Sequence, residues 1–351
     1  STTPKPATDP VCVAVRVAGS TQNASQTASL AGQFRLRCVS GGAVHPFSDA
    51  NGSGGSLASA GMLRLVLPKG SLEKATLELF EAADLPVRRS STVDYQATID
   101  DPRIGSVRIL RPQEIPMYVA EGLFDVGITG RDWVEETGSV VETLGELKYS
   151  KATSNPIRLV VAVAGDSDAE SVADLPNGVR VQSEYPELTR RFFADHGVDA
   201  EVRLSYGATE AKIPDIADCV VEITETGRAL RAAGLKVIDT ILSSYTEVVA
   251  NPAAAKDPEK RRARDEIMTL LNGVLDARGR VLLKLNVTED AKESVLAVLP
   301  SMKSPTMSPL AGGGYAVESV VEKQKINLVI PALIAAGATD LVEMAIAKIV
   351  P

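Results

Sequence analysis

The stretch that decides the fold reads "DCVVEITETGRAL" at residues 218–230. An apolar run from Cys219 ends in one acid, Glu222, and is followed by hydroxyls, Gly227 and a helical pattern. A buried strand that enters a helix in this way presents unpaired backbone amides and the positive end of a helix dipole. The stretch therefore predicts a phosphate-binding loop, although a structural strand, turn and helix cap would show the same pattern.

Composition excludes several classes of protein. The chain has 351 residues, 44% of them hydrophobic, and a formal net charge of −8, so it is long enough for two or three domains. The acidic balance argues against a nucleic-acid surface, and no apolar run approaches the ~20 residues of a membrane span. Three cysteines, Cys12, Cys38 and Cys219, fit neither a disulfide scaffold nor a zinc site. We expect a soluble, cytoplasmic protein without a membrane or nucleic-acid partner.

The first 61 residues differ from the rest of the chain. They are rich in Ser, Ala, Gly and Thr, and their only acids are Asp9 and Asp49. Such a composition predicts a disordered N-terminal extension, and a transit peptide would have the same character. A strand pattern begins at Met62, which we interpret as the true or mature start of the protein.

From Met62 onwards, short apolar strands alternate with amphipathic helices, which is typical of an α/β fold with parallel sheets. We expect one lobe from residues 62–156 plus about 235–278, and a second lobe from 157–234. Residues 279–351 follow a βαββαβ pattern, typical of a ferredoxin-like domain. Asp257 as an N-cap and Pro258 behind it predict a long connecting helix to Arg278, whose basic residues we interpret as a solvated face.

Two further strand-to-helix junctions repeat the pattern of the opening stretch. "LPKGSL" at 67–72 places Lys69 and Gly70 after a strand, and "DVGITGRD" at 125–132 places glycines on both sides of Thr129. A lysine can meet phosphate as a point charge. Open α/β sheets bind ligands at the carboxyl ends of their strands, so the three junctions predict one crevice for a multiply phosphorylated ligand.

From Met62 to Pro351 the chain resembles the long form of ATP phosphoribosyltransferase. The matching stretches, in the family's order, are "LRLVLPKGSLE", "ILRPQEIPMYV", "FDVGITGRDWV", "SEYPELT", "YGATE", "VVEITETGRALRAAGL" and "LPSMKSPTMSPLA". The resemblance implies two lobes like those of periplasmic binding proteins, followed by a ferredoxin-like regulatory domain that senses histidine. It implies a homohexamer that joins ATP to phosphoribosyl pyrophosphate (PRPP) with Mg²⁺, as the first step of histidine biosynthesis.

The resemblance also assigns roles to single positions. Glu222, a possible metal ligand, would accept from the ribose hydroxyls, Glu210 would lie close to the reacting centre, and Ser304 and Thr306 would meet the effector histidine. Lys69 would act in catalysis beside these acids. The PRPP loop would comprise Glu222, Thr224, Glu225, Thr226, Gly227, Arg228, Ala229 and Leu230. ATP and pyrophosphate would meet Lys69, Gly70, Arg111, Thr129, Gly130, Asp132 and Tyr185, with Tyr185 beside the adenine.

The sequence departs from the family pattern at two positions. Ala229 stands where many members have Thr, which removes a hydroxyl donor, and Gln113 stands where Lys is common, which leaves position 113 without a clear role. His196 is expected to end a helix before Gly197, and Cys219 and Trp133 are expected to pack in the core. Two alternatives remain: a two-lobed solute-binding protein without catalysis, and a catalytically silent regulatory paralogue. The absence of an apolar signal region in the extension weakens the first alternative, and the intact "ETG" loop weakens the second.

Overall fold

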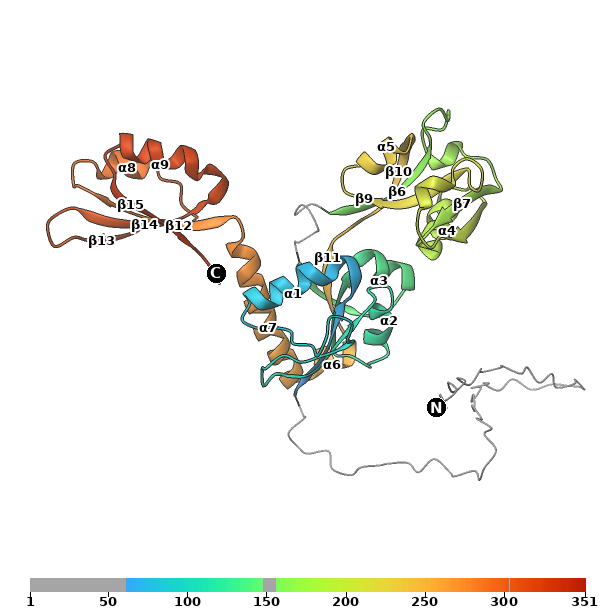
Figure 1. Cartoon of the computed structure of the whole chain (residues 1–351), viewed down its shortest axis with the longest axis horizontal. Coiled ribbons are helices and arrows are strands. Elements are labelled where there is room, and N and C mark those ends of the chain that lie inside the picture. The colour runs from blue at the N-terminus through green and yellow to red at the C-terminus, as the bar shows by residue number, and fades with distance from the viewer. Residues whose placement is uncertain (1–60, 148–155, 303) are drawn as a thin grey trace, which may run out of the picture. The chain divides into compact units, whose positions relative to one another are not determined.

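The computed structural model describes residues 61–147, 156–302 and 304–351 (Figure 1). The disorder expected for residues 1–61 falls outside the described residues, apart from Gly61. In this part of the chain the strands form three sheets, and each sheet is packed against a hydrophobic cluster of its own. No helix among the described residues is both long and apolar enough to cross a membrane.

The first sheet has the strand order β2-β3-β1-β4-β11-β5. β1 is parallel to β3 and β4, whereas β11 is antiparallel to β4 and β5, so the sheet is mixed and not purely parallel as expected. The reason is that β11 returns to this sheet after the chain has built the second one. The strands are β1 (Leu63–Pro68), β2 (Gln96–Ala97), β3 (Ile104–Leu110), β4 (Val126–Gly130), β5 (Glu142–Leu147) and β11 (Thr246–Ala250), and the helices are α1 (Glu73–Ala82), α2 (Ile115–Ala120), α3 (Arg131–Thr137), α6 (Pro252–Lys256) and α7 (Pro258–Ala277).

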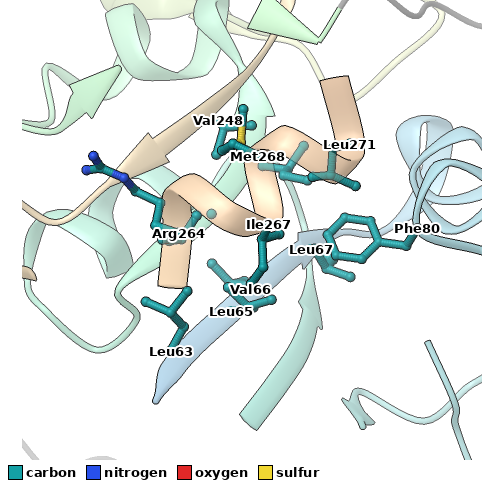
Figure 2. A pocket seen from close by; sticks show the side chains of 13 residues that line it. Leu63, Leu65, Val66, Leu67, Phe80, Val248, Arg264, Ile267, Met268 and Leu271 are labelled. Atoms are coloured by element: carbon teal, nitrogen blue, oxygen red, sulfur yellow. The ribbon is translucent and has the colours of Figure 1, made fainter. Parts of the chain in front are cut away.

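Helix α7 covers this sheet with one apolar stripe. Its residues Ile267, Met268 and Leu271 line one pocket with the leucines of β1, Val248 of β11 and Phe80 of α1 (Figure 2). The spacing of one, three and four residues puts these side chains on one side of the helix. Leu271 is 2% exposed, so its truncation to Ala would cost ~2–5 kcal/mol of folding stability.

The start of α7 follows the sequence prediction, but its basic face does not. The side chain of Asp257 accepts hydrogen bonds from the amides of the next turn, as expected for an N-cap before Pro258. Lys260 is not a solvated residue, because its Nζ lies 2.9 Å from Oδ1 of the buried Asp125. Arg264, 11% exposed, is likewise held in ion pairs. The solvated face is therefore limited to the exposed Arg261 and Arg262.

The second sheet has the strand order β10-β6-β9-β7-β8. β10 pairs with β6 along its whole length, which corrects the expectation that residues from about 235 join the first lobe. The chain crosses to the first sheet at Tyr245, between β10 and β11. The sequence did not predict this crossing, because a strand pattern alone does not say which sheet the strand extends. The strands are β6 (Ile157–Ala164), β7 (Val179–Ser183), β8 (Ala200–Leu204), β9 (Cys219–Thr224) and β10 (Leu235–Ser244), and the helices are α4 (Pro186–Asp195) and α5 (Arg228–Ala232).

The third sheet confirms the ferredoxin-like prediction. Its order is β13-β14-β12-β15, with every neighbouring pair antiparallel, and α8 and α9 lie on the same side of it (Figure 1). Alternate residues of β12 are buried, which is the pattern of a strand with one covered face. The elements are β12 (Arg280–Val287), α8 (Lys292–Val298), β13 (Thr306–Pro309), β14 (Tyr315–Glu322), α9 (Ile326–Ala335) and β15 (Thr339–Ala345).

Candidate active site

The loop between β9 and α5 is a tight turn held by its own side chains. Gly227 has φ +70°, a conformation that favours glycine, and its amide donates a 2.7 Å hydrogen bond to Oγ1 of Thr224. Nη2 of Arg231 donates to the carbonyl of Thr226 at 2.9 Å. A Cβ on Gly227 would lie 2.8 Å from Nη1 of Arg231. The turn therefore favours glycine for its backbone conformation, and a side chain at this position would also displace the end of Arg231.

Glu222 is half-buried where β9 reaches this loop, after three buried residues. Burial raises the pKa of its carboxyl group, and the negative charges of Glu184 and Glu210 add to that shift. Hydrogen bonds from the Ile223 amide and the Thr209 hydroxyl oppose it by stabilising the carboxylate. The structure thus brings the predicted pair Glu210 and Glu222 into electrostatic range.

Glu184 joins this group although it was not predicted. It follows β7, and β7 is the parallel neighbour of β9, with Ser183 paired to Val221. Glu184 and Glu222 therefore stand one residue beyond the same register position on adjacent strands. The sequence shows that Glu184 is an acid directly after a buried strand. It does not show that this strand lies beside β9, which is what brings Glu184 near Glu222.

Lys212 is connected to Glu222 through a chain of hydrogen bonds. Lys212 donates hydrogen bonds to Oγ of Ser205 and, at 3.3 Å, to Oε1 of Gln182. Ser205 and Thr209 share a 2.7 Å hydrogen bond, and both are buried. With the Thr209 hydroxyl bonded to Glu222, the network runs from a cation to the carboxylate through two hydroxyls. The sequence analysis overlooked Lys212, which has no motif of its own.

In the first sheet, Lys69 follows β1, with its Nζ 3.9 Å from the centroid of the Tyr95 ring. Gly70 has φ +85°, and its amide donates to Oε2 of Glu73 at 3.2 Å. Arg111 follows β3, directly beyond Leu110, and is exposed. Lys69 and Arg111 therefore stand at the ends of two parallel, adjacent strands.

Thr129 and Gly130 are more deeply placed than a ligand contact would suggest. Thr129 is fully buried, and its hydroxyl donates to the carbonyl of Pro112 at 2.8 Å. A Cβ on Gly130 would lie 2.1 Å from Oδ1 of Asp132, so a larger residue would displace this buried carboxylate. Oε1 of Gln113, in the same loop as Pro112, is buried and has no hydrogen-bond partner among the described residues.

Asp132 and Tyr185 meet in a buried cluster. The Tyr185 hydroxyl donates to Oδ2 of Asp132 at 2.6 Å, the Ser244 hydroxyl donates to Oδ1 at 2.7 Å, and the Tyr185 ring stacks on Trp133 at 4.3 Å. Burial raises the pKa of Asp132, and burial together with the neighbouring Asp132 raises the pKa of Tyr185. Tyr185 is 2% exposed, so in this arrangement its ring offers no surface to an adenine.

Three structural expectations are met. Cys219 is fully buried in β9, and Trp133 packs against Tyr185. His196 caps the end of α4, and Gly197 behind it has φ +74°.

In the C-terminal domain, Ser304 and Thr306 line one hollow together with Glu318 of β14. None of these observations identifies a ligand.

The described residues contain no group of three or more His, Cys, Asp or Glu side chains arranged to hold a metal. A site with few protein carboxylates fits a Mg²⁺ ion that is held mainly by phosphate oxygens of a substrate, because Mg²⁺ in such sites binds one or two carboxylates and keeps several waters. Glu222 is one carboxylate at this loop, and Glu184 and Glu210 lie in electrostatic range of it.

Comparisons with known proteins agree with this architecture. A family model for ATP phosphoribosyltransferase matches residues 111–273, and one for the HisG C-terminal domain matches residues 277–348. ATP phosphoribosyltransferases of Pelotomaculum thermopropionicum and Desulforudis audaxviator are 46% and 43% identical to this chain, covering 82% of it and 99% of their own length. The solved HisG:HisZ complex of Thermotoga maritima matches with a TM-score of 0.53 and 26% identity, over 61% of this chain and 99% of that one.

Two mixed sheets and an appended ferredoxin-like domain make a multidomain α/β protein, and the family model and the similar proteins place it among the transferases. The chain belongs to the ATP phosphoribosyltransferase family. Membership makes it an enzyme of the first step of histidine biosynthesis, a reaction in which the family generally uses a divalent metal.

Proposed function

We propose that the protein transfers the phosphoribosyl group of PRPP to N1 of ATP, giving N1-(5-phosphoribosyl)-ATP and pyrophosphate. The observation that carries the proposal is the half-buried Glu222 directly before the turn at Gly227. PRPP has a 5′-phosphate and two ribose hydroxyls on one ring. An acceptor for hydroxyls followed by a turn that admits close approach of a phosphate suits both groups.

In this proposal the loop from Glu225 to Leu230 binds the 5′-phosphate. The glycine at position 227 lets the backbone approach the phosphate, and the hydroxyls of Thr224 and Thr226 are further donors. The Thr224 oxygen accepts from the Gly227 amide, which leaves its own proton free to donate. Arg228 adds positive charge, and Ala229 contributes backbone only.

Glu222 is the acceptor for the ribose hydroxyls. Its carboxylate form is needed for this role, and the hydrogen bond from Thr209 supports that form. Glu210 and Glu184 share the region, so their negative charges favour a substrate that gains positive charge at its reacting carbon. Displacement of pyrophosphate from the anomeric carbon passes through such an oxocarbenium-like state.

Lys69 and Arg111 are the cations for the departing pyrophosphate and the ATP phosphates. They stand beyond two adjacent parallel strands, so both can address one group of oxygens. When bound, Mg²⁺ supplies further neutralisation of the leaving pyrophosphate. The N1 lone pair forms the new bond to the anomeric carbon as the bond to the pyrophosphate oxygen breaks. No nucleophilic side chain is required, and the work of the chain is to position both substrates.

The remaining expectations belong to the same proposal. Histidine binds in the C-terminal domain near Ser304 and Thr306 and inhibits the enzyme, which works in the cytoplasm as a homohexamer. Both side chains line one hollow, which supports a common ligand. Gly70, Thr129, Gly130, Asp132 and Tyr185 remain proposed ATP contacts, although the burial of Thr129, Asp132 and Tyr185 favours a supporting role for these three.

The test is to mix the purified protein with ATP, PRPP, Mg²⁺ and pyrophosphatase and to follow the ultraviolet absorbance of an N1-substituted adenine. The proposal predicts an absorbance change that requires both substrates. A two-lobed solute-binding protein or a catalytically silent paralogue would bind a ligand without this change. Calorimetric binding of PRPP with no product would therefore overturn the proposed activity.

A further inference from the structure

A hollow at the edge of the first sheet gathers three arginines. Its walls include Arg88, Arg89 and Arg108, together with Asp94, Thr98 and Ser106. We call it the arginine hollow. Arg108 and Ser106 belong to β3, and the other four residues lie in the segments directly before and after β2.

Two of these arginines have no carboxylate partner in the described part of the chain. Arg88 makes no side-chain hydrogen bond or ion pair there, and Nη1 of Arg108 donates only to the carbonyl of Val107, at 3.2 Å. Arg89 differs, since its Nη1 lies 2.8 Å from Oε1 of Glu73. Elsewhere arginines such as Arg103 and Arg180 contact carboxylates at 2.6 Å. Arg88 therefore lacks a carboxylate partner, and Arg108 has only a minor electrostatic interaction with Asp94, so both guanidinium groups can still bind a ligand.

Backbone pairing fixes both arginines in place. Arg88 and Thr98 exchange two hydrogen bonds of 2.8 and 2.9 Å as an antiparallel bridge. Gln96 of β2 pairs with Arg108 of β3. The backbones of Arg88 and Arg108 are therefore both held at the same edge of the first sheet. A ligand would need to order only the side chains, which lowers the entropy lost on binding.

The acid in the hollow is committed to its own loop. Oδ2 of Asp94 accepts from the Ser90 hydroxyl at 2.5 Å, and Oδ1 accepts from the Gln96 amide at 2.9 Å. These bonds, with a smaller contribution from Arg108, keep the pKa of Asp94 below its usual range. Even with Asp94 and Glu73 ionised, the three arginines leave the hollow positive. The hydroxyls of Thr98 and Ser106 have no hydrogen-bond partner among the described residues and can donate.

We propose that the arginine hollow binds a phosphate-type oxyanion through Arg88 and Arg108. Guanidinium forks match the oxygens of phosphate in pairs, and the two hydroxyls supply further donors for a tetrahedral group with several acceptors. This site goes beyond the proposed function, since none of these residues belongs to the PRPP loop or to the expected ATP contacts.

The test titrates inorganic phosphate into the full chain by calorimetry at low ionic strength. The parent is compared with Arg88→Gln/Arg108→Gln and with the control Arg261→Gln/Arg262→Gln, which removes two exposed charges from α7. Each protein also carries Gly227→Val in a second series, to remove phosphate binding at the PRPP loop. We expect at least about tenfold weaker binding in the hollow variant, as for the loss of charged hydrogen bonds, and parent-like binding in the control.

A variant that retains the charge guards against an effect on folding. Arg88→Lys/Arg108→Lys should recover part of the phosphate affinity, whereas acetate at equal ionic strength should not compete with phosphate. Equal phosphate binding by the parent and the glutamine variant would overturn the proposal. So would equal competition by acetate, because the hollow would then be a general anion surface.

Steady-state kinetics of the same glutamine variant identify the source of the phosphate. A higher KM for ATP or PRPP, with weaker phosphate binding, assigns the hollow to a phosphate group of that substrate. Unchanged KM values with weaker phosphate binding assign it to a separate phosphorylated effector. The phosphate titration needs no turnover, so a parent without transferase activity would overturn the proposed function and leave this site to be judged by the binding data alone.

Discussion

The hydroxyl of Tyr185 donates a 2.6 Å hydrogen bond to Oδ2 of Asp132. Oδ1 of the same carboxylate accepts from Ser244, so both oxygens are engaged. The three residues come from α3, from the start of α4 and from the end of β10. Asp132 is 3% exposed, and an acid so deeply buried makes stability depend on pH.

The first prediction concerns the pH dependence of stability. Burial raises the pKa of Asp132 above its ordinary value of 3.8, so the folded protein holds this proton more tightly than the unfolded chain does. Its contribution to the free energy of unfolding therefore falls as pH rises from about that value through the raised pKa. Asp132→Asn should lose this part of the pH dependence in urea unfolding curves, whereas the exposed control Asp195→Asn should keep it. Identical pH slopes for parent and Asp132→Asn would contradict the account.

The second prediction concerns the turn at Gly227. Gly227→Val places a branched side chain at φ +70°, a backbone conformation that L residues rarely adopt, so the turn must change its backbone conformation. We expect the KM for PRPP to rise strongly while the circular dichroism spectrum is retained. Gly197→Val is the matched control, since Gly197 has φ +74° with no neighbouring atom within 4 Å of its Cβ position. If both variants keep the parent's PRPP kinetics, the loop does not bind PRPP.

The third prediction concerns Glu222. Glu222→Gln preserves the shape of the side chain and removes its charge, so kcat/KM for PRPP should fall about tenfold to a hundredfold, or ~1.5–3 kcal/mol for one charged hydrogen bond. The exposed Glu201→Gln on β8 removes the same charge away from the loop and should behave as the parent. A Glu222→Gln enzyme of full activity would show that this acid only ends a strand.

The fourth prediction concerns regulation by the C-terminal domain. Millimolar histidine should inhibit the full-length enzyme without competing with PRPP, and Thr306→Val should weaken this inhibition because it removes a hydroxyl from the hollow. Ser308→Ala, on the same strand β13 but outside that hollow, is the control. Truncation after Arg278 should abolish the sensitivity. A coupling of ~1–3 kcal/mol corresponds to about fivefold to 150-fold inhibition. An active enzyme that binds no histidine in calorimetry would leave the domain with an assembly role.

Periodicity was enough to predict most of the elements, because strands and helices that cover one another bury alternate or helically spaced residues. The C-terminal βαββαβ order and the capped helix α7 followed from such local signals. The short strand β5, from Glu142 to Leu147, was missed, since only Leu147 of its six residues is buried. Its pairing with β11, about one hundred residues later in sequence, is a tertiary choice that no local pattern contains.

The candidate site was predictable where it follows one strand and not where it joins distant segments. Glu222 and Gly227 stand out within a single stretch of thirteen letters. Asp132 and Ser244 are 112 positions apart, and their hydrogen bond depends on how β10 ends. Glu184 lies between these cases, because an acid after a buried strand is visible in the sequence but its register with Glu222 requires the sheet.

The central claim is that the chain forms a bond between ATP and the ribose of PRPP. Mass spectrometry of a reaction with purified protein, ATP, PRPP and Mg²⁺ tests it most directly. The account predicts one new nucleotide with the mass of ATP plus a phosphoribosyl group, formed one for one with pyrophosphate and absent when either substrate is omitted. Recovery of unchanged ATP and PRPP from a folded protein that binds PRPP would contradict it.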